Sequence, residues 1–68
     1  MKELFGLAEK LRALRQETGM TQRDVAAKLD ITYQSYQAYE LGLTVPTLQN
    51  FIKLAKLFDV SYDELLDS

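Results

Sequence analysis

The chain has 68 residues, of which 47% are hydrophobic and 26% are charged, with a formal net charge of −2. This length predicts one small domain, residues 1–68, whose core is close to the minimum that stabilises a fold. Because the chain has no cysteine and no histidine, disulfide bonds, a Cys/His zinc site and histidine-based catalysis are excluded. We expect no metal, no cofactor and a reducing, cytoplasmic location.

The first predicted helix ends near Thr18. Leucines recur at the three- and four-residue spacing of an amphipathic helix, at Leu4, Leu7, Leu11 and Leu14. Gly19 follows, at the position where many helices end in a left-handed residue. Charges interrupt the apolar residues of the opening segment MKELFGLAEKLR, so we expect neither a signal peptide nor a membrane span.

Two short helices separated by a tight turn are predicted within residues 21–41. Thr21 and Asp24 have the spacing of a capping box, which starts a helix over about residues 22–29. Thr32 caps the next helix, over about residues 33–41. Asp30 lies in the turn, where its short polar side chain tolerates a left-handed backbone. Together these signals predict a helix-turn-helix.

The second helix of this pair, the third of the chain, has two chemically different sides. Tyr36 and Tyr39 are three residues apart and are expected to pack on Ala26 of the preceding helix and on the first helix. The opposite side carries four residues without charge, which are Tyr33, Gln34, Gln37 and Ala38. Such a surface indicates hydrogen bonding to a partner.

Two further helices complete an all-α prediction with five helices. Pro46 rules out a continuous helix beyond the third one, and Thr47 caps the fourth. We expect a broad apolar side of this helix to lie against the core, formed by Leu48, Phe51, Ile52, Leu54, Ala55 and Phe58. Ser61 and Glu64 have the spacing of a second capping box, which starts the fifth helix.

Acidic residues are concentrated near the C-terminal end of the chain. Residues 1–58 carry eight basic and six acidic side chains, a balance of +2. This distribution weakens the objection that a net negative charge raises to a nucleic-acid partner. We expect no enzymatic activity, because capping explains the adjacent acids Asp63 and Glu64, and no nucleophile and base pair or glycine-rich phosphate loop is present.

The chain resembles the Cro and phage-repressor type of helix-turn-helix domain, known as the XRE family. The resemblance rests on LRALRQETGMTQRDVAAKLDIT, on the Tyr39-Glu40-x-Gly42 step followed by Pro46, and on LQNFIKLAKLFDVSYDELL. It implies a compact, lambda-repressor-like domain of five helices. It also implies that the protein is a transcriptional repressor, which places its third helix in the major groove of double-stranded DNA. No small-molecule ligand is implied.

The resemblance extends to individual positions. Those that match base-reading residues are Tyr33, Gln34, Gln37 and Ala38. Those expected to contact phosphates are Gln22, Arg23, Arg15, Thr32 and Thr44. Arg15 and Glu40 match an arginine and a glutamate that the family commonly pairs, so we expect Glu40 to be structural.

The third helix carries no arginine or lysine, so nothing in it favours guanine. Gln34 or Gln37 can make paired hydrogen bonds to adenine. Tyr33 and Ala38 offer apolar surface to a thymine methyl group, so we expect an operator that contains A·T pairs. Residues 43–45 stand where the family commonly has lysine or arginine, which predicts weaker and less salt-sensitive binding.

A domain of this size covers one half-site, so we expect a homodimer on a palindromic operator. Candidate interface residues are Leu43, Val45, Tyr62 and Leu66. The chain is either a complete small Cro-like regulator or the DNA-binding half of a longer repressor. The main alternative function is a protein-interaction module that binds a protein partner through the Tyr33, Gln34 and Gln37 face. The acidic C-terminus and the uncharged loop favour this alternative.

Overall fold

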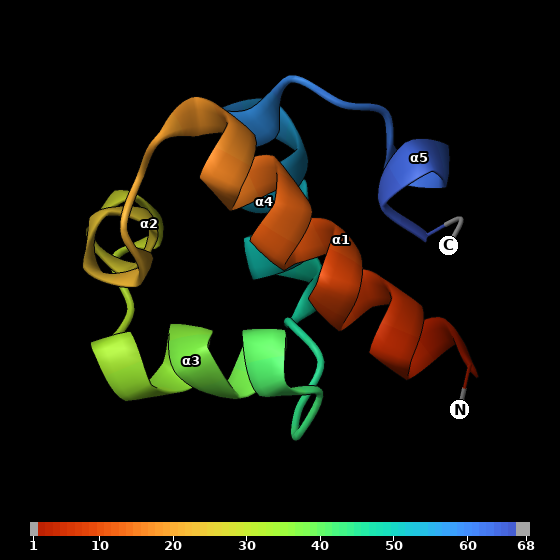
Figure 1. The fold of residues 1–68 in the computed structure, drawn as a ribbon, viewed down its shortest axis with the longest axis horizontal. Helices are drawn as coiled ribbons and strands as arrows, with labels where there is room; N and C mark the ends of the chain where they lie inside the picture. Colours follow the sequence, from red (N-terminus) through yellow and green to blue (C-terminus); the bar gives the residue numbers. More distant parts are fainter. Residues whose placement is uncertain (1, 67–68) are drawn as a thin grey trace.

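Five helices make up the part of the chain that the structure describes. The computed structural model describes the backbone of residues 2–66 and the side chains of residues 6–66. The helices, shown in Figure 1, are α1 (Lys2–Thr18), α2 (Gln22–Leu29), α3 (Tyr33–Leu41), α4 (Leu48–Phe58) and α5 (Tyr62–Leu66). No strand occurs in this range, and the all-α prediction with five helices is confirmed. None of these helices has the length and apolar composition that a bilayer crossing requires.

Side-chain caps define where α2, α3 and α4 begin. The Thr21 hydroxyl accepts from the Asp24 backbone N–H at 3.0 Å, and the Asp24 carboxylate accepts from the Thr21 N–H at 2.9 Å. These bonds to Thr21 lower the pKa of Asp24. Thr32 and Thr47 each accept from the backbone N–H three residues later. Because each cap satisfies an N–H group that the helix leaves without a partner, it fixes the residue at which the helix begins.

The turn between α2 and α3 is held in one conformation by Asp30. Asp30 has a left-handed backbone with φ 60°, which its short polar side chain tolerates. The next residue, Ile31, donates its N–H to the Ala26 carbonyl at 3.0 Å, which closes the C-terminal turn of α2. Only residues 30–32 separate the two helices, so this turn sets the angle at which they cross.

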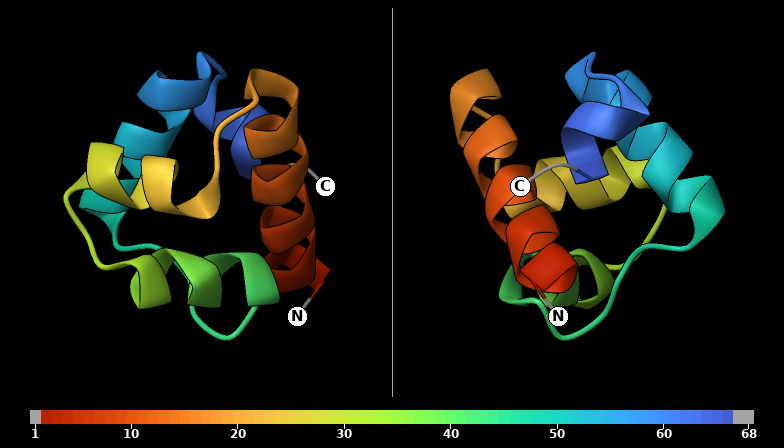
Figure 2. Two further views of the ribbon diagram at one scale, coloured as in Figure 1. Left: turned by 60° about the vertical axis from the view of Figure 1, so that its left-hand side comes forward. Right: turned by 90° about the vertical axis from the view of Figure 1, so that its right-hand side faces the viewer.

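The core lies between α1 and the other four helices. Its largest fully buried side chains come from all five helices and are Tyr36, Leu11, Leu29, Leu54, Leu65 and Val25. In the views of Figures 1 and 2, α3 forms one edge of the molecule. Tyr36 and Tyr39 are buried on its inner side, as the spacing predicted. The opposite side of α3 is therefore left facing solvent.

The prediction for α4 is wrong at its first residue. Leu48 has 75% of its surface exposed, whereas Leu54, Ala55 and Phe58 are buried. Phe51 is the first apolar residue of α4 that packs against the core, and Ile52 is only partly buried. In α1 the predicted stripe is buried at Leu7, Leu11 and Leu14, and the side chain of Leu4 lies outside the described residues.

Candidate nucleic-acid interface

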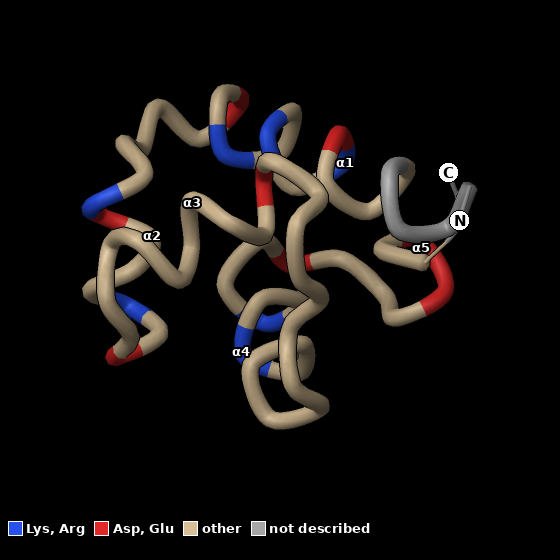
Figure 3. Tube along the Cα trace, turned by 90° about the horizontal axis from the view of Figure 1, so that it is seen from below, with Lys and Arg blue, Asp and Glu red and all other residues tan. Residues whose placement is uncertain are grey.

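The outward side of α3 carries the four residues predicted to read bases. Gln34 is exposed, and Tyr33, Gln37 and Ala38 are partly buried. Because residues four apart on a helix are neighbours, Tyr33 lies beside Gln37 and Gln34 lies beside Ala38. Figure 3 views the molecule from this side, and the only charged residue of α3 is Glu40. The structure thus collects an uncharged set of amide, phenol and methyl groups on one surface.

Tyr33 makes a contact that the sequence did not predict. The Arg23 guanidinium carbon lies 4.2 Å from the centroid of the Tyr33 ring, a distance typical of a cation–π contact. The Gln37 amide nitrogen donates to the Tyr33 hydroxyl at 3.4 Å. The spacing of Tyr33 and Gln37 could have indicated the second contact. No local pattern indicates the first, because it depends on how α2 crosses α3.

Glu40 joins three helices through hydrogen bonds. Arg15 of α1 donates to its carboxylate from Nε at 2.7 Å and from Nη2 at 3.1 Å. Gln22 of α2 donates its amide to the same carboxylate at 3.0 Å, and Arg15 also donates to the Met20 carbonyl at 3.1 Å. Glu40 is only 4% exposed. This buried, bidentate pair fixes α3 against α1 and α2.

Both members of the pair are ionised at neutral pH. Burial acts to raise the pKa of Glu40, but the hydrogen bond from Arg15, the neighbouring Tyr36 hydroxyl and the hydrogen bond from Gln22 outweigh it and hold that pKa below its usual value. The hydrogen bond to Glu40 raises the pKa of Arg15. Both carboxylate oxygens of Glu40 thus accept hydrogen bonds from within the domain.

Residues predicted to contact phosphates lie on both sides of α3. Arg15 and Gln22 meet Glu40, and Arg23 meets Tyr33, along one side. On the other side the exposed Thr44 lines a depression of about 420 Å³, together with Gln34, Ser35, Ala38, Tyr39 and Val45. Thr32 differs from these residues because its hydroxyl already donates to Ser35 Oγ at 2.9 Å. A phosphate contact from the Thr32 hydroxyl would therefore replace an existing bond.

The predicted dimer residues form two separate patches. Leu43 and Val45, 71% and 58% exposed, lie on the loop after α3, whereas Tyr62 and Leu66, 50% and 54% exposed, lie on α5. Figures 1 and 2 show that loop and α5 at different ends of the molecule. Leu65, between the two residues on α5, is fully buried and belongs to the core.

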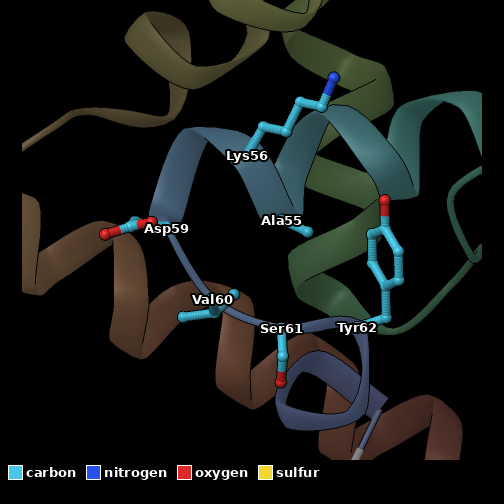
Figure 4. Close-up of a pocket in the computed structure, with 6 residues that line it drawn as sticks. All are labelled: Ala55, Lys56, Asp59, Val60, Ser61 and Tyr62. Atoms are coloured by element: carbon cyan, nitrogen blue, oxygen red, sulfur yellow. The ribbon is translucent and has the colours of Figure 1, made fainter.

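A second depression, of about 370 Å³, lies between α4 and α5. Figure 4 shows its lining residues, whose polar side chains point apart: Lys56 and Asp59 extend in different directions, and Ser61 points away from both. A ligand site needs polar groups that converge, so this depression offers none. Among the side chains of residues 6–66, no group of three histidine, cysteine, aspartate or glutamate residues is placed to hold a metal.

Comparisons with known proteins agree with this geometry. A family model described as helix-turn-helix matches residues 11–65. The chain is 41% identical over 59 residues to the uncharacterized HTH-type transcriptional regulator YqaE of Bacillus subtilis, an alignment that covers 87% of this chain and 51% of the relative. It is 36% identical over 59 residues to the cryptic phage CTXphi transcriptional repressor RstR of Vibrio cholerae, covering 87% of this chain and 53% of the relative.

A third relative is the HTH-type transcriptional regulator ImmR of Bacillus subtilis, 37% identical over 62 residues, which cover 91% of this chain and 49% of ImmR. The chain thus spans about half the length of these relatives. No solved structure gives a significant match. The family model covers most of the chain and includes the whole of α2, α3 and α4. The chain belongs to the helix-turn-helix family of the Cro and phage-repressor type.

Proposed function

We propose that residues 1–68 form the DNA-binding domain of a transcriptional repressor that reads the major groove of double-stranded DNA with α3. The observation that carries this proposal is the outward side of α3, where two glutamines lie among uncharged side chains, with Arg15, Gln22 and Arg23 on one side and Thr44 on the other. The name of one relative, RstR, describes a phage transcriptional repressor, which supports repression. The domain is proposed to act in the cytoplasm and to have no enzymatic activity.

Base recognition would come mainly from Gln34 and Gln37. A glutamine amide can accept from adenine N6 and donate to adenine N7, and each such pair contributes about 1–3 kcal/mol of discrimination. Ala38 and the depression beside it offer apolar surface to a thymine methyl group. With no cation on α3 to bind guanine, the proposed operator is read at A·T pairs.

Affinity would come from groups beside α3. Arg23 and the N-terminus of α2 would contact one phosphate. Arg15 keeps N–H groups beyond those that bind Glu40 and Met20, and these could donate to a second phosphate. The loop of residues 42–47 carries no charge. With about two cationic contacts in each half-site, the logarithm of affinity should fall with the logarithm of salt at a slope of about −2 for one domain.

A homodimer on a palindromic operator completes the proposal. Half-sites would lie about 34 Å apart, one turn of the double helix. We propose that the two copies contact each other through the loop patch, formed by Leu43 and Val45 and the exposed hydrophobic residues beside them. Residues 41–48 hold four of the exposed large hydrophobic side chains, Leu41, Leu43, Val45 and Leu48, and no charged residue. Two copies can therefore pair there without burying a charge.

Selection of bound sequences from a random DNA pool at 150 mM salt tests the function. The expected result is a palindrome whose half-sites are rich in A·T pairs, with Gln34→Ala and Gln37→Ala each relaxing one base pair. If both variants kept the wild-type preference, α3 would not be the reader.

Sedimentation tests the proposed dimer. The Leu43→Ser, Val45→Ser double variant is compared with the Tyr62→Ser, Leu66→Ser double variant. Loss of self-association in the first alone identifies the loop patch.

A protein-interaction module on the same scaffold is the second candidate. The acidic end of the chain, Asp59 to Asp67, and the uncharged loop favour it. Salt distinguishes the two functions, since binding to DNA weakens steeply with salt through release of counterions. A chain that enriches no DNA sequence and whose weak DNA affinity does not depend on salt would favour the protein partner.

A further inference from the structure

We propose that Tyr33 is a positioning residue, which links a phosphate contact at Arg23 to base recognition by Gln37 and does not itself read a base. This inference rests on the proposed DNA-binding function and concerns how the recognition surface is built. It revises the expectation that Tyr33 contacts a thymine methyl group. As a consequence, Gln37 should distinguish its base pair from the alternatives more strongly than Gln34 does.

One face of the Tyr33 ring is occupied by Arg23. The guanidinium carbon lies 4.2 Å from the ring centroid, close enough for stacking and for attraction between the cation and the ring. A stacked guanidinium still presents its N–H groups at its edge, where a phosphate oxygen can accept from them. A phosphate bound there would keep Arg23 over the ring, and Arg23 would keep the ring in place.

The hydroxyl group of Tyr33 contacts Gln37. The amide nitrogen of Gln37 donates to the Tyr33 hydroxyl at 3.4 Å. An amide nitrogen has two N–H groups, so Gln37 retains one N–H and its carbonyl oxygen for a base. The bond holds the Gln37 side chain next to the Tyr33 hydroxyl. Gln37 is therefore partly ordered before it binds DNA, and less conformational entropy is lost when it binds adenine.

Gln34 provides an internal comparison on the same helix. It is exposed and has no side-chain hydrogen bond to any residue between 6 and 66. Its amide must be ordered by the DNA alone, which costs free energy that Gln37 has already spent in the free protein. The base pair read by Gln37 should accordingly show stronger discrimination than the base pair read by Gln34.

The test compares the wild type with Tyr33→Phe, which keeps the ring and removes only the hydroxyl, in the random-pool selection and in titrations of the selected operator. Loss of one neutral hydrogen bond should lower discrimination at the Gln37 base pair about fivefold. Discrimination at the Gln34 base pair and the salt slope should not change. Tyr36→Phe, the same chemical change on the buried side of α3, is the matched control and should leave every base preference unaltered.

Two further variants test the link to the phosphate and the route to the base. Arg23→Ala should reduce the salt slope by about one unit per half-site and also lower discrimination at the Gln37 base pair. Lys28→Ala, which removes a cation from the other end of α2, should leave that base pair unaffected. In a Gln37→Ala background, Tyr33→Phe should have no further effect on base preference, because Tyr33 acts only through Gln37.

The outcomes separate this inference from the proposed function. A wild-type chain that selects an operator, with Tyr33→Phe leaving the Gln37 base pair unchanged, overturns the positioning role and leaves the DNA-binding function intact. A change in base preference when Tyr33→Phe is made in the Gln37→Ala background also overturns it, since Tyr33 would then read a base directly. A wild-type chain that selects no sequence overturns the DNA-binding function, and the positioning role with it.

Discussion

The rings of Tyr36 and Tyr39 meet edge to face, with centroids 6.1 Å apart and planes at 80°, yet their hydroxyl groups have opposite environments. The Tyr39 hydroxyl accepts from the Asn50 side-chain amide at 3.1 Å. The Tyr36 hydroxyl is buried and makes no hydrogen bond of acceptable geometry among the described residues. Burial raises the pKa of Tyr36, and the neighbouring Glu40 carboxylate raises it further. An unpartnered buried hydroxyl destabilises a fold, whereas a bonded one stabilises it.

The same substitution at these two tyrosines should therefore have effects of opposite sign. Tyr36→Phe removes a hydroxyl without a partner and should raise the free energy of unfolding by about 1 kcal/mol. Tyr39→Phe leaves the Asn50 amide unpaired and should lower it by about 1 kcal/mol. Urea denaturation followed by circular dichroism measures both values. A marked loss of stability in Tyr36→Phe would show that its hydroxyl bonds to the nearby Glu40 carboxylate.

Replacing Glu40 by glutamine should destabilise the domain strongly. Glu40→Gln leaves the Arg15 guanidinium charged and largely buried without its ionic partner, which typically costs about 3–5 kcal/mol for a buried pair. Because the Arg15 side chain keeps 15% exposure, we expect a loss near the lower end of that range. Glu9→Gln, an exposed position on α1, is the control and should change stability by less than about 0.5 kcal/mol. Equal effects of the two substitutions would show that the pair contributes little.

Acid should weaken the fold through the same carboxylate. The pKa of Glu40 in the folded protein is below the ordinary value of 4.5, so the folded state binds this proton less readily than the unfolded chain. Its contribution is therefore fully present above pH 4.5 and is lost as the pH falls through the folded pKa. Unfolding by urea at pH 7, 5, 4 and 3 should show this decline.

The acid dependence should be reduced, but not abolished, in Glu40→Gln. Asp24 also has a lowered pKa, owing to its hydrogen bonds with Thr21, so it contributes in the same direction. A wild-type protein with constant stability from pH 7 to pH 3 would contradict the ionised pair.

Replacing Gly19 should destabilise the domain moderately, through the conformation of its own backbone. Its φ is +78°, and a methyl group added there would meet nothing within 4 Å. Gly19→Ala should therefore cost about 1 kcal/mol through the left-handed conformation alone. Gly19→Asn should cost less, because asparagine enters this region more readily. Thermal unfolding of the two variants gives the comparison, and equal melting temperatures would contradict it.

Local signals in the sequence were sufficient to predict where α2 and α3 begin and end. Thr21, Asp24 and Asp30 act on their immediate neighbours, and the interactions expected of them are those that the structure shows. The exposure of Leu48 was not predictable in this way. Helical spacing identifies the side of α4 on which Leu48 lies, but how far the neighbouring helices extend beneath that side depends on the packing of the whole domain.

In the candidate site, too, local spacing predicts features within one helix but not contacts between helices. The outward side of α3 follows from spacing within one helix. Arg15 and Glu40 are separated by 25 residues, and their pairing was expected only from the family resemblance. The contact between Arg23 and Tyr33 was not expected at all, because it joins two helices whose crossing angle is set by three residues of turn.

The lack of any cation on α3 separates the choice of DNA sequence from the strength with which the domain holds DNA. The glutamines that would choose bases carry no charge, and the arginines that would hold phosphates lie on α1 and α2. Substitution at Gln34 could therefore give a protein with a new operator and an unchanged response to ionic strength. Duplicated copies of such a repressor could diverge in the sites they recognise while remaining equally able to search the same chromosome.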